Sequence, residues 1–132
     1  MRQTVAGLMM ANAALFLFGA AQHAGVRIGP LIDPTILPAS IVETLCAFAL
    51  TGGSFAAWNR SSRAWPAALA GNLVAIGGVS IGMVALALGA GPRTTSNDLY
   101  HRLMLALAGS AALFLLLPYG RRALKARPAY RP

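Results

Sequence analysis

Long apolar runs separated by short polar segments make up most of the chain. Four of these runs have the length of about 20 residues that a helix needs to cross a hydrocarbon core. They cover roughly residues 4–22, 36–58, 66–90 and 99–118. The pattern predicts an all-α fold, an integral membrane bundle of four helices over residues 1–118, followed by a basic tail over residues 119–132.

Local signals agree with the limits of these runs. Pro38 favours the first turn of the second helix, and Pro66 favours the first turn of the third. Gly89 is typical of a residue that ends a helix. Thr95, with Asp98 three residues later, predicts a capping box at the start of the fourth helix.

Composition excludes a water-soluble domain. Hydrophobic residues make up 57% of the chain and charged residues only 11%, whereas about 25% of residues are charged in soluble proteins. The formal net charge of +8 is also typical of proteins that bind nucleic acids. Here, however, the cations lie between and beyond the apolar runs, as they do at membrane boundaries. We therefore expect a multi-pass protein of the cell membrane and no nucleic-acid partner.

The distribution of cations predicts the orientation. Four spans put both termini on one side, and eight of the eleven lysines and arginines fall on that side. Cytoplasmic loops carry such an excess, so both termini are expected to be cytoplasmic. The basic tail is also expected to attract anionic lipid. The eight residues are Arg2, Arg60, Arg63, Arg121, Arg122, Lys125, Arg127 and Arg131.

Small residues predict how the helices pack. In membranes, close packing and polar contacts hold helices together, and glycine lets two backbones approach. The third run carries a face with Gly71, Gly78 and Gly82 at helical spacing. The second run presents a matching stripe, which we expect to face it and which consists of Ser40, Ala47, Thr51 and Ser54. This pattern favours a compact bundle, with a homo-oligomer or a larger membrane complex as the alternative.

Two asparagines lie inside apolar runs and are further candidates for holding the bundle together. Asn12 is in the first run and Asn72 in the third. Buried amides of this kind form hydrogen bonds between helices in membranes. We therefore expect Asn12 and Asn72 to bond to neighbouring helices.

Glu43 is the one carboxylate inside an apolar run, five residues after Pro38. At 1.5 Å per residue it lies about 8 Å from the outer end of its helix. An acid in a membrane needs a partner or a function. We expect it to point into the bundle, within reach of His23, His101 or Arg102.

The neighbours of this carboxylate differ in how far local structure explains them. Asp98 and Arg102, at i and i+4, predict a local ion pair on the fourth helix. Capping explains Asp98, and the turn before the second helix explains Asp33. This leaves Glu43, His23 and His101 without a local explanation. The candidates for binding a ligand or an ion are these three residues together with Asp98 and Arg102.

Catalytic motifs are missing from the sequence: there is no nucleophile elbow, no phosphate-binding loop and no pair of acids on one helix. The pattern favours a non-enzymatic binding or accessory subunit with a polar cluster at the outer end of the bundle. Two alternatives remain open. One is a small oligomeric transporter that uses Glu43 to couple ions or protons, and the other is a metal or haem site built on His23 and His101.

Overall fold

The computed structural model describes residues 1–28, 34–91 and 93–125, so the expectations for Asp33, Arg127 and Arg131 lie outside the described residues. The described part is all-helical. Four of its helices are long and apolar enough to cross a membrane, which confirms the predicted fold at that level. The five helices are α1 (Arg2–His23), α2 (Leu37–Trp58), α3 (Ala64–Ala87), α4 (Thr95–Leu116) and α5 (Pro118–Leu124).

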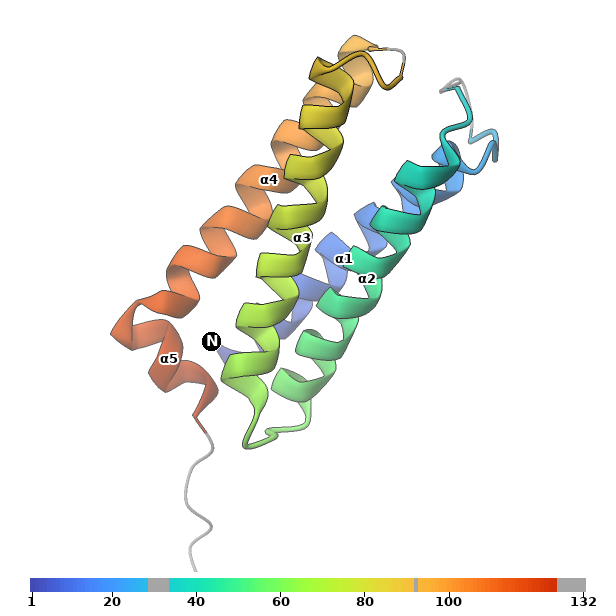
Figure 1. Ribbon diagram of the computed structural model, residues 1–132. Coiled ribbons are helices and arrows are strands. Elements are labelled where there is room, and N and C mark those ends of the chain that lie inside the picture. The colour runs from blue at the N-terminus through green and yellow to red at the C-terminus, as the bar shows by residue number, and fades with distance from the viewer. Residues whose placement is uncertain (29–33, 92, 126–132) are drawn as a thin grey trace, which may run out of the picture.

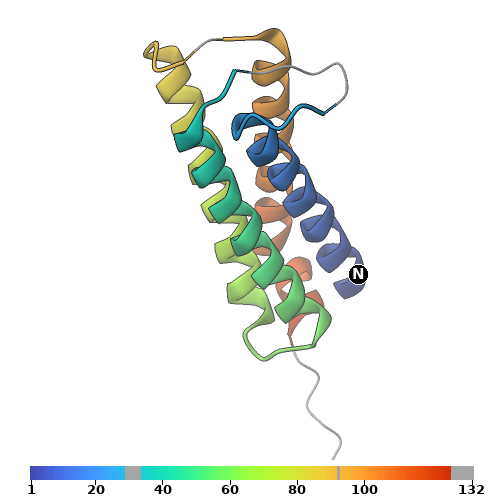
Figure 2. The ribbon, with the colours of Figure 1, turned by 90° about the vertical axis from the view of Figure 1, so that its right-hand side faces the viewer.

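The four long helices run alternately up and down in one bundle (Figure 1). One end holds the N-terminus, the α2–α3 turn and the short α5, and we call it the basal end (Figure 2). The other end, the distal end, holds the α1–α2 and α3–α4 connections. Helices that are neighbours in sequence pack closely, whereas α1 and α4 touch at few places.

The helices begin and end where the local sequence signals predict, except at the start of α4. Pro38 lies in the first turn of α2, and Gly89, with φ of +81°, follows the end of α3. The cap of α4 is Thr94, whose Oγ1 accepts a hydrogen bond of 3.1 Å from the backbone N–H of Asn97. The predicted cap at Thr95 was therefore wrong by one residue, because Thr94 is the last residue with extended backbone.

Gly71, Gly78 and Gly82 of α3 face other helices, as predicted. A Cβ added at Gly71 would lie 2.7 Å from the carbonyl oxygen of Ala49 in α2. At Gly78 it would meet the Cys46 sulfur, and at Gly82 it would lie 3.3 Å from Nε2 of His101 in α4. Lack of a side chain at these positions lets α3 approach both neighbours.

The two serines of the predicted α2 stripe bond to α1 and not to α3, which corrects the prediction for them. Ser40 Oγ donates a hydrogen bond of 2.8 Å to the carbonyl oxygen of Ala20, and Ser54 Oγ donates one of 2.7 Å to that of Ala6. Both carbonyls belong to α1. At the α2–α3 contact the side chain that meets Gly78 is the thiol of Cys46, whereas the two hydroxyls bond on the side of α2 that faces α1.

The basal end is tied together by side chains that bond to backbone carbonyls. The Arg2 guanidinium donates hydrogen bonds of 2.8 Å to the carbonyl oxygens of Leu124 and Lys125, at the end of α5. Trp65 Nε1 donates a bond of 2.8 Å to the Leu115 carbonyl oxygen. The first part of the predicted tail is therefore a helix held by the N-terminus, because Arg2 satisfies carbonyls that a helix end leaves open.

Candidate functional site

A pocket of about 200 Å³ lies at the distal end of the bundle. All four long helices contribute to its wall, which is mostly apolar. Its polar members include His23, Glu43 and His101, the three residues for which the sequence offered no local explanation. The structure thus brings together side chains from α1, α2 and α4 that lie as many as 78 positions apart in the chain.

Glu43 points into the bundle and meets His23, as expected. Its Oε1 lies 3.7 Å from Nε2 of His23, and the two side chains are only 6% and 3% exposed. This separation fits an ion pair but exceeds a hydrogen bond of 2.7–3.2 Å. Among the described residues, neither carboxyl oxygen of Glu43 makes a well-formed hydrogen bond. The acid is held in place yet keeps unused capacity to accept hydrogen bonds.

Gly19 and Tyr100 complete the surroundings of this acid, and neither role was predicted from the sequence. The Tyr100 hydroxyl donates a hydrogen bond of 3.2 Å to the Leu15 carbonyl oxygen and lies close enough to Glu43 to interact with it. A Cβ at Gly19 would lie 2.9 Å from Oε2 of Glu43. Gly19 therefore makes room for the acid, but nothing in its local sequence distinguishes it from other glycines.

His101 presents one ring nitrogen to the pocket. Its Nδ1 lies 2.9 Å from the carbonyl oxygen of Asn97, one turn earlier in α4. A carbonyl oxygen can only accept, so Nδ1 carries the hydrogen in the neutral ring and Nε2 keeps its lone pair. That Nε2 faces Gly82, whose missing side chain leaves space beside it.

Asp98 and Arg102 lie outside the pocket, and the predicted pair between them is wrong. Asp98 Oδ2 is instead 2.8 Å from the guanidinium of Arg93, which precedes the helix. Arg102 is exposed. Arg93 lies just before α4, and its side chain extends to Asp98 in the first turn of that helix. Asp98 is therefore paired with Arg93 and not with Arg102.

Within the described ranges, no three histidine, cysteine, aspartate or glutamate side chains converge closely enough to hold a metal ion. His23, Glu43 and His101 share one pocket without forming such a group. The metal alternative through the two histidines therefore gains no support from the geometry. Haem binding through them stays an untested prediction.

The pocket offers hydrogen-bond acceptors. The carboxyl oxygens of Glu43 and the Nε2 of His101 can both receive a donor, and none of the described lysines or arginines is part of the wall. Comparison with known protein families, curated proteins and solved structures gives no match. Function is therefore inferred from the chemistry of the pocket.

Proposed function

We propose that the chain is a multi-pass protein of the cell membrane that acts as a non-enzymatic binding or accessory subunit. Its ligand is a small apolar amine, held in the distal pocket. One observation carries this proposal: the three residues that local structure does not explain line the same cavity. Polar groups that converge in an otherwise apolar pocket are typical of ligand sites.

Two features of the pocket favour an amine. The buried carboxylate of Glu43 lacks a well-formed hydrogen bond among the described residues, and an ammonium group supplies three donors. A hydrogen bond between two charged groups is about twice as strong as a neutral one. His101 Nε2 provides a second acceptor, and the apolar remainder of the wall suits a hydrocarbon body.

The core below Glu43 favours binding over transport. Phe16, Cys46 and Leu50 are buried there and are apolar. A transporter coupled through Glu43 needs polar groups that continue toward the other side of the membrane. The buried polar side chains of the described helices farther toward the basal end, Asn12, Ser54 and Asn72, carry no charge, so a site that takes up and releases its ligand on the distal side agrees better with the packing.

Nitrogen NMR of the histidine rings tests the proposal. The chain has two histidines, so ¹⁵N-histidine labelling gives two imidazole groups, which a His101→Leu variant assigns. Phenethylamine is the probe, and ethylbenzene is the matched compound without a donor. We expect phenethylamine to shift the Nε2 signal of His101 and ethylbenzene to leave it in place, because only the amine donates to Nε2.

Two results would contradict the amine site. In the first, both compounds shift the His101 signal equally, which means that the pocket recognises only the hydrocarbon body. In the second, phenethylamine binds to saturation while the Nε2 signal stays unchanged, which places the amine elsewhere on the protein.

We also propose that both termini face the cytoplasm and that the basic tail contacts anionic lipid. Six described cations support this, because they belong to the basal end: Arg2, Arg60, Arg63, Arg121, Arg122 and Lys125. Lysine and arginine accumulate on the cytoplasmic side of membrane proteins. The distal pocket then opens toward the outside of the cell.

Cysteine labelling in intact cells tests this orientation. In a Cys46→Ala background, Thr95→Cys places a thiol at the exposed start of α4, and Ser62→Cys places one in the α2–α3 turn. An impermeant maleimide added outside is expected to label the Thr95 variant and not the Ser62 variant. The reverse labelling pattern would mean that the protein has the opposite orientation in the membrane, with the pocket on the cytoplasmic side.

A further inference from the structure

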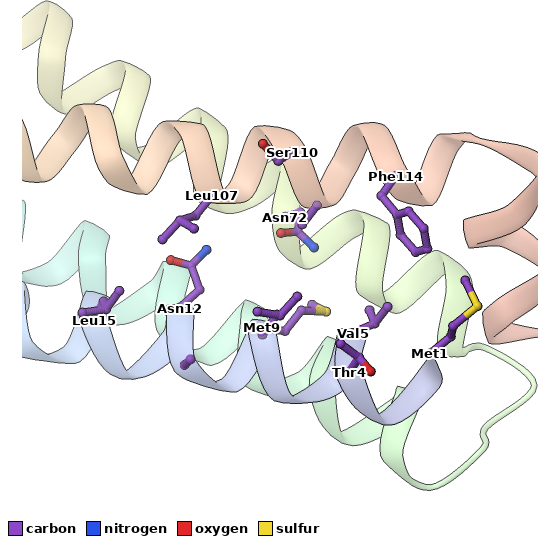
Figure 3. Close-up of a pocket in the computed structure, with 13 residues that line it drawn as sticks. Met1, Thr4, Val5, Met9, Asn12, Leu15, Asn72, Leu107, Ser110 and Phe114 are labelled. Carbon is purple, nitrogen blue, oxygen red and sulfur yellow. The ribbon is translucent and has the colours of Figure 1, made fainter.

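A second cavity, of about 470 Å³, lies between α1 and α4 (Figure 3). It is separate from the distal pocket, with which it shares no residue. We call it the α1–α4 groove. It forms where the bundle is most loosely packed, since α1 and α4 touch at few places. Its wall is mostly apolar, with side chains such as Leu8, Leu15, Leu107 and Phe114, and its hydroxyl-bearing members are Thr4 and Ser110.

Two buried asparagines interrupt this apolar wall. Asn12 on α1 is 5% exposed and Asn72 on α3 is 1% exposed, and Figure 3 shows both side chains in the space between α1 and α4. Asn72 Nδ2 donates a hydrogen bond of 2.9 Å to the Ala68 carbonyl oxygen of its own helix. Among the described residues, neither Oδ1 has a hydrogen-bond partner. The predicted bonds from Asn12 and Asn72 to neighbouring helices are therefore not formed.

An unsatisfied buried amide is costly, about 1–3 kcal/mol for each group. The two Oδ1 atoms thus mark a place where a donor from outside the chain is favoured. Asn12 lies near the middle of α1, so this donor has to be available at mid-depth in the membrane. An unsubstituted acyl chain brings no donor to that depth, and phospholipid head groups stay at the surface.

We infer that the α1–α4 groove binds a lipid-like molecule, with an acyl or prenyl chain, that carries a hydroxyl group at mid-depth. The hydroxyl donates its hydrogen to Oδ1 of Asn72 and accepts one from Nδ2 of Asn12. One hydroxyl then bonds to both side chains, and its single hydrogen satisfies the Oδ1 of Asn72, since a hydroxyl has one donor and two acceptor lone pairs. The hydrocarbon chain covers the leucines of the wall.

The size and position of the groove favour a chain molecule over a partner helix. A cavity of about 470 Å³ falls within the range of about 300–1,000 Å³ found for small-molecule sites. A helix with side chains is about 10–12 Å across and does not enter a space of this volume. Leu8, Leu15 and Leu107 at the wall are exposed on the outer surface, so the ligand reaches the groove from the lipid.

Native mass spectrometry of the whole chain tests this inference. The protein is loaded with 12-hydroxystearate or stearate, two fatty acids that differ only in a hydroxyl partway along the chain. Two neutral hydrogen bonds favour the hydroxylated acid by about tenfold, given about 0.5–1.5 kcal/mol for each bond. We therefore expect the wild-type chain to retain 12-hydroxystearate about tenfold more strongly than stearate.

Variants separate the polar contact from the apolar one. Asn12→Leu is expected to lower the preference from about tenfold to about threefold, because it removes one of the two hydrogen-bond partners of the hydroxyl and leaves Oδ1 of Asn72. Leu107→Trp fills the groove and is expected to lower the retention of both acids. Thermal unfolding of each variant verifies that the bundle is intact, and Asn12→Leu is expected to be at least as stable as wild type because it removes an unsatisfied buried group.

Three outcomes would overturn the inference. Equal retention of the two acids by the wild-type chain means that the groove holds only hydrocarbon. A tenfold preference that survives Asn12→Leu places the hydroxyl at another site. Detection of a dimer that Asn12→Leu dissociates, with no difference between the two acids, assigns the groove to a second copy of the chain.

Discussion

Replacing Gly71 by alanine is expected to lower the free energy of unfolding by about 3 kcal/mol, the upper part of the usual range for overpacking. The added Cβ would lie 2.7 Å from the carbonyl oxygen of Ala49 and 3.1 Å from its carbonyl carbon. These atoms belong to the backbone of α2, so no side-chain rotation relieves the contact. The two helices have to move apart, and the contacts along their interface weaken with them.

Gly77→Ala on the same helix is the matched control. A Cβ at Gly77 meets no atom within 4 Å, and alanine favours a helix over glycine by about 1 kcal/mol. This variant is therefore expected to be as stable as wild type or slightly more stable. Unfolding in mixed micelles with increasing denaturing detergent measures both changes. If Gly71→Ala and Gly77→Ala unfold together, α2 and α3 are not in close contact at this depth.

Loss of the Glu43 carboxylate is expected to weaken phenethylamine binding at least 30-fold while the bundle stays folded. Removing one partner of a buried charged pair costs about 2–5 kcal/mol of binding free energy, and 1.4 kcal/mol is tenfold. Glu43→Gln retains the shape of the side chain without the charge. Glu43→Leu replaces it with an apolar group that packs against the same wall.

Stability distinguishes this binding role from a purely structural one. The contact with His23 is 3.7 Å long, so we expect Glu43→Gln to lower the free energy of unfolding by only about 1 kcal/mol. Glu43→Leu is expected to cost no more, since a packed apolar residue often matches a buried ion pair. A decrease of several kcal/mol in the free energy of unfolding of either variant, with amine binding retained, would show that Glu43 has a structural role and not a binding role.

Asp98→Asn provides the control for charge. Asp98 is also a carboxylate at the distal end, but it pairs with Arg93 and lies outside the pocket. Its removal is expected to leave phenethylamine binding unchanged. A loss equal to that of Glu43→Gln would show that the general negative charge of the distal end, and not the pocket, attracts the amine.

The four spans could be predicted because length and apolar composition alone determine whether a helix can cross a membrane. Close approach at Gly71, Gly78 and Gly82 was also predictable, since glycines at helical spacing act through the absence of a side chain. Glu43 was correctly placed inside the bundle because a buried carboxylate needs a partner. Each of these inferences depends on one helix at a time.

The features that the sequence did not reveal depend on how two helices are rotated against each other. Whether the serines of α2 face α1 or α3 depends on that rotation, as does the position of Tyr100 beside Glu43. Arg93 competes with Arg102 for Asp98 because of how the chain enters α4. The α1–α4 groove is a property of the complete bundle and cannot be recognised from single helices. Asn12 and Asn72 were therefore expected to bond to neighbouring helices.

In the described part of the chain, the hydrogen bonds that join α1 to α4 and α5 form two groups, one on the distal side of the α1–α4 groove and one at the basal end. On the distal side Tyr100 bonds to the Leu15 carbonyl, and at the basal end Arg2 bonds to the carbonyls of Leu124 and Lys125. Local opening requires the least free energy where apolar contacts are few. The α1–α4 groove can therefore widen when these bonds break, while the α1–α2, α2–α3 and α3–α4 contacts persist. A molecule dissolved in the membrane can thus enter and leave the interior without global unfolding of the protein.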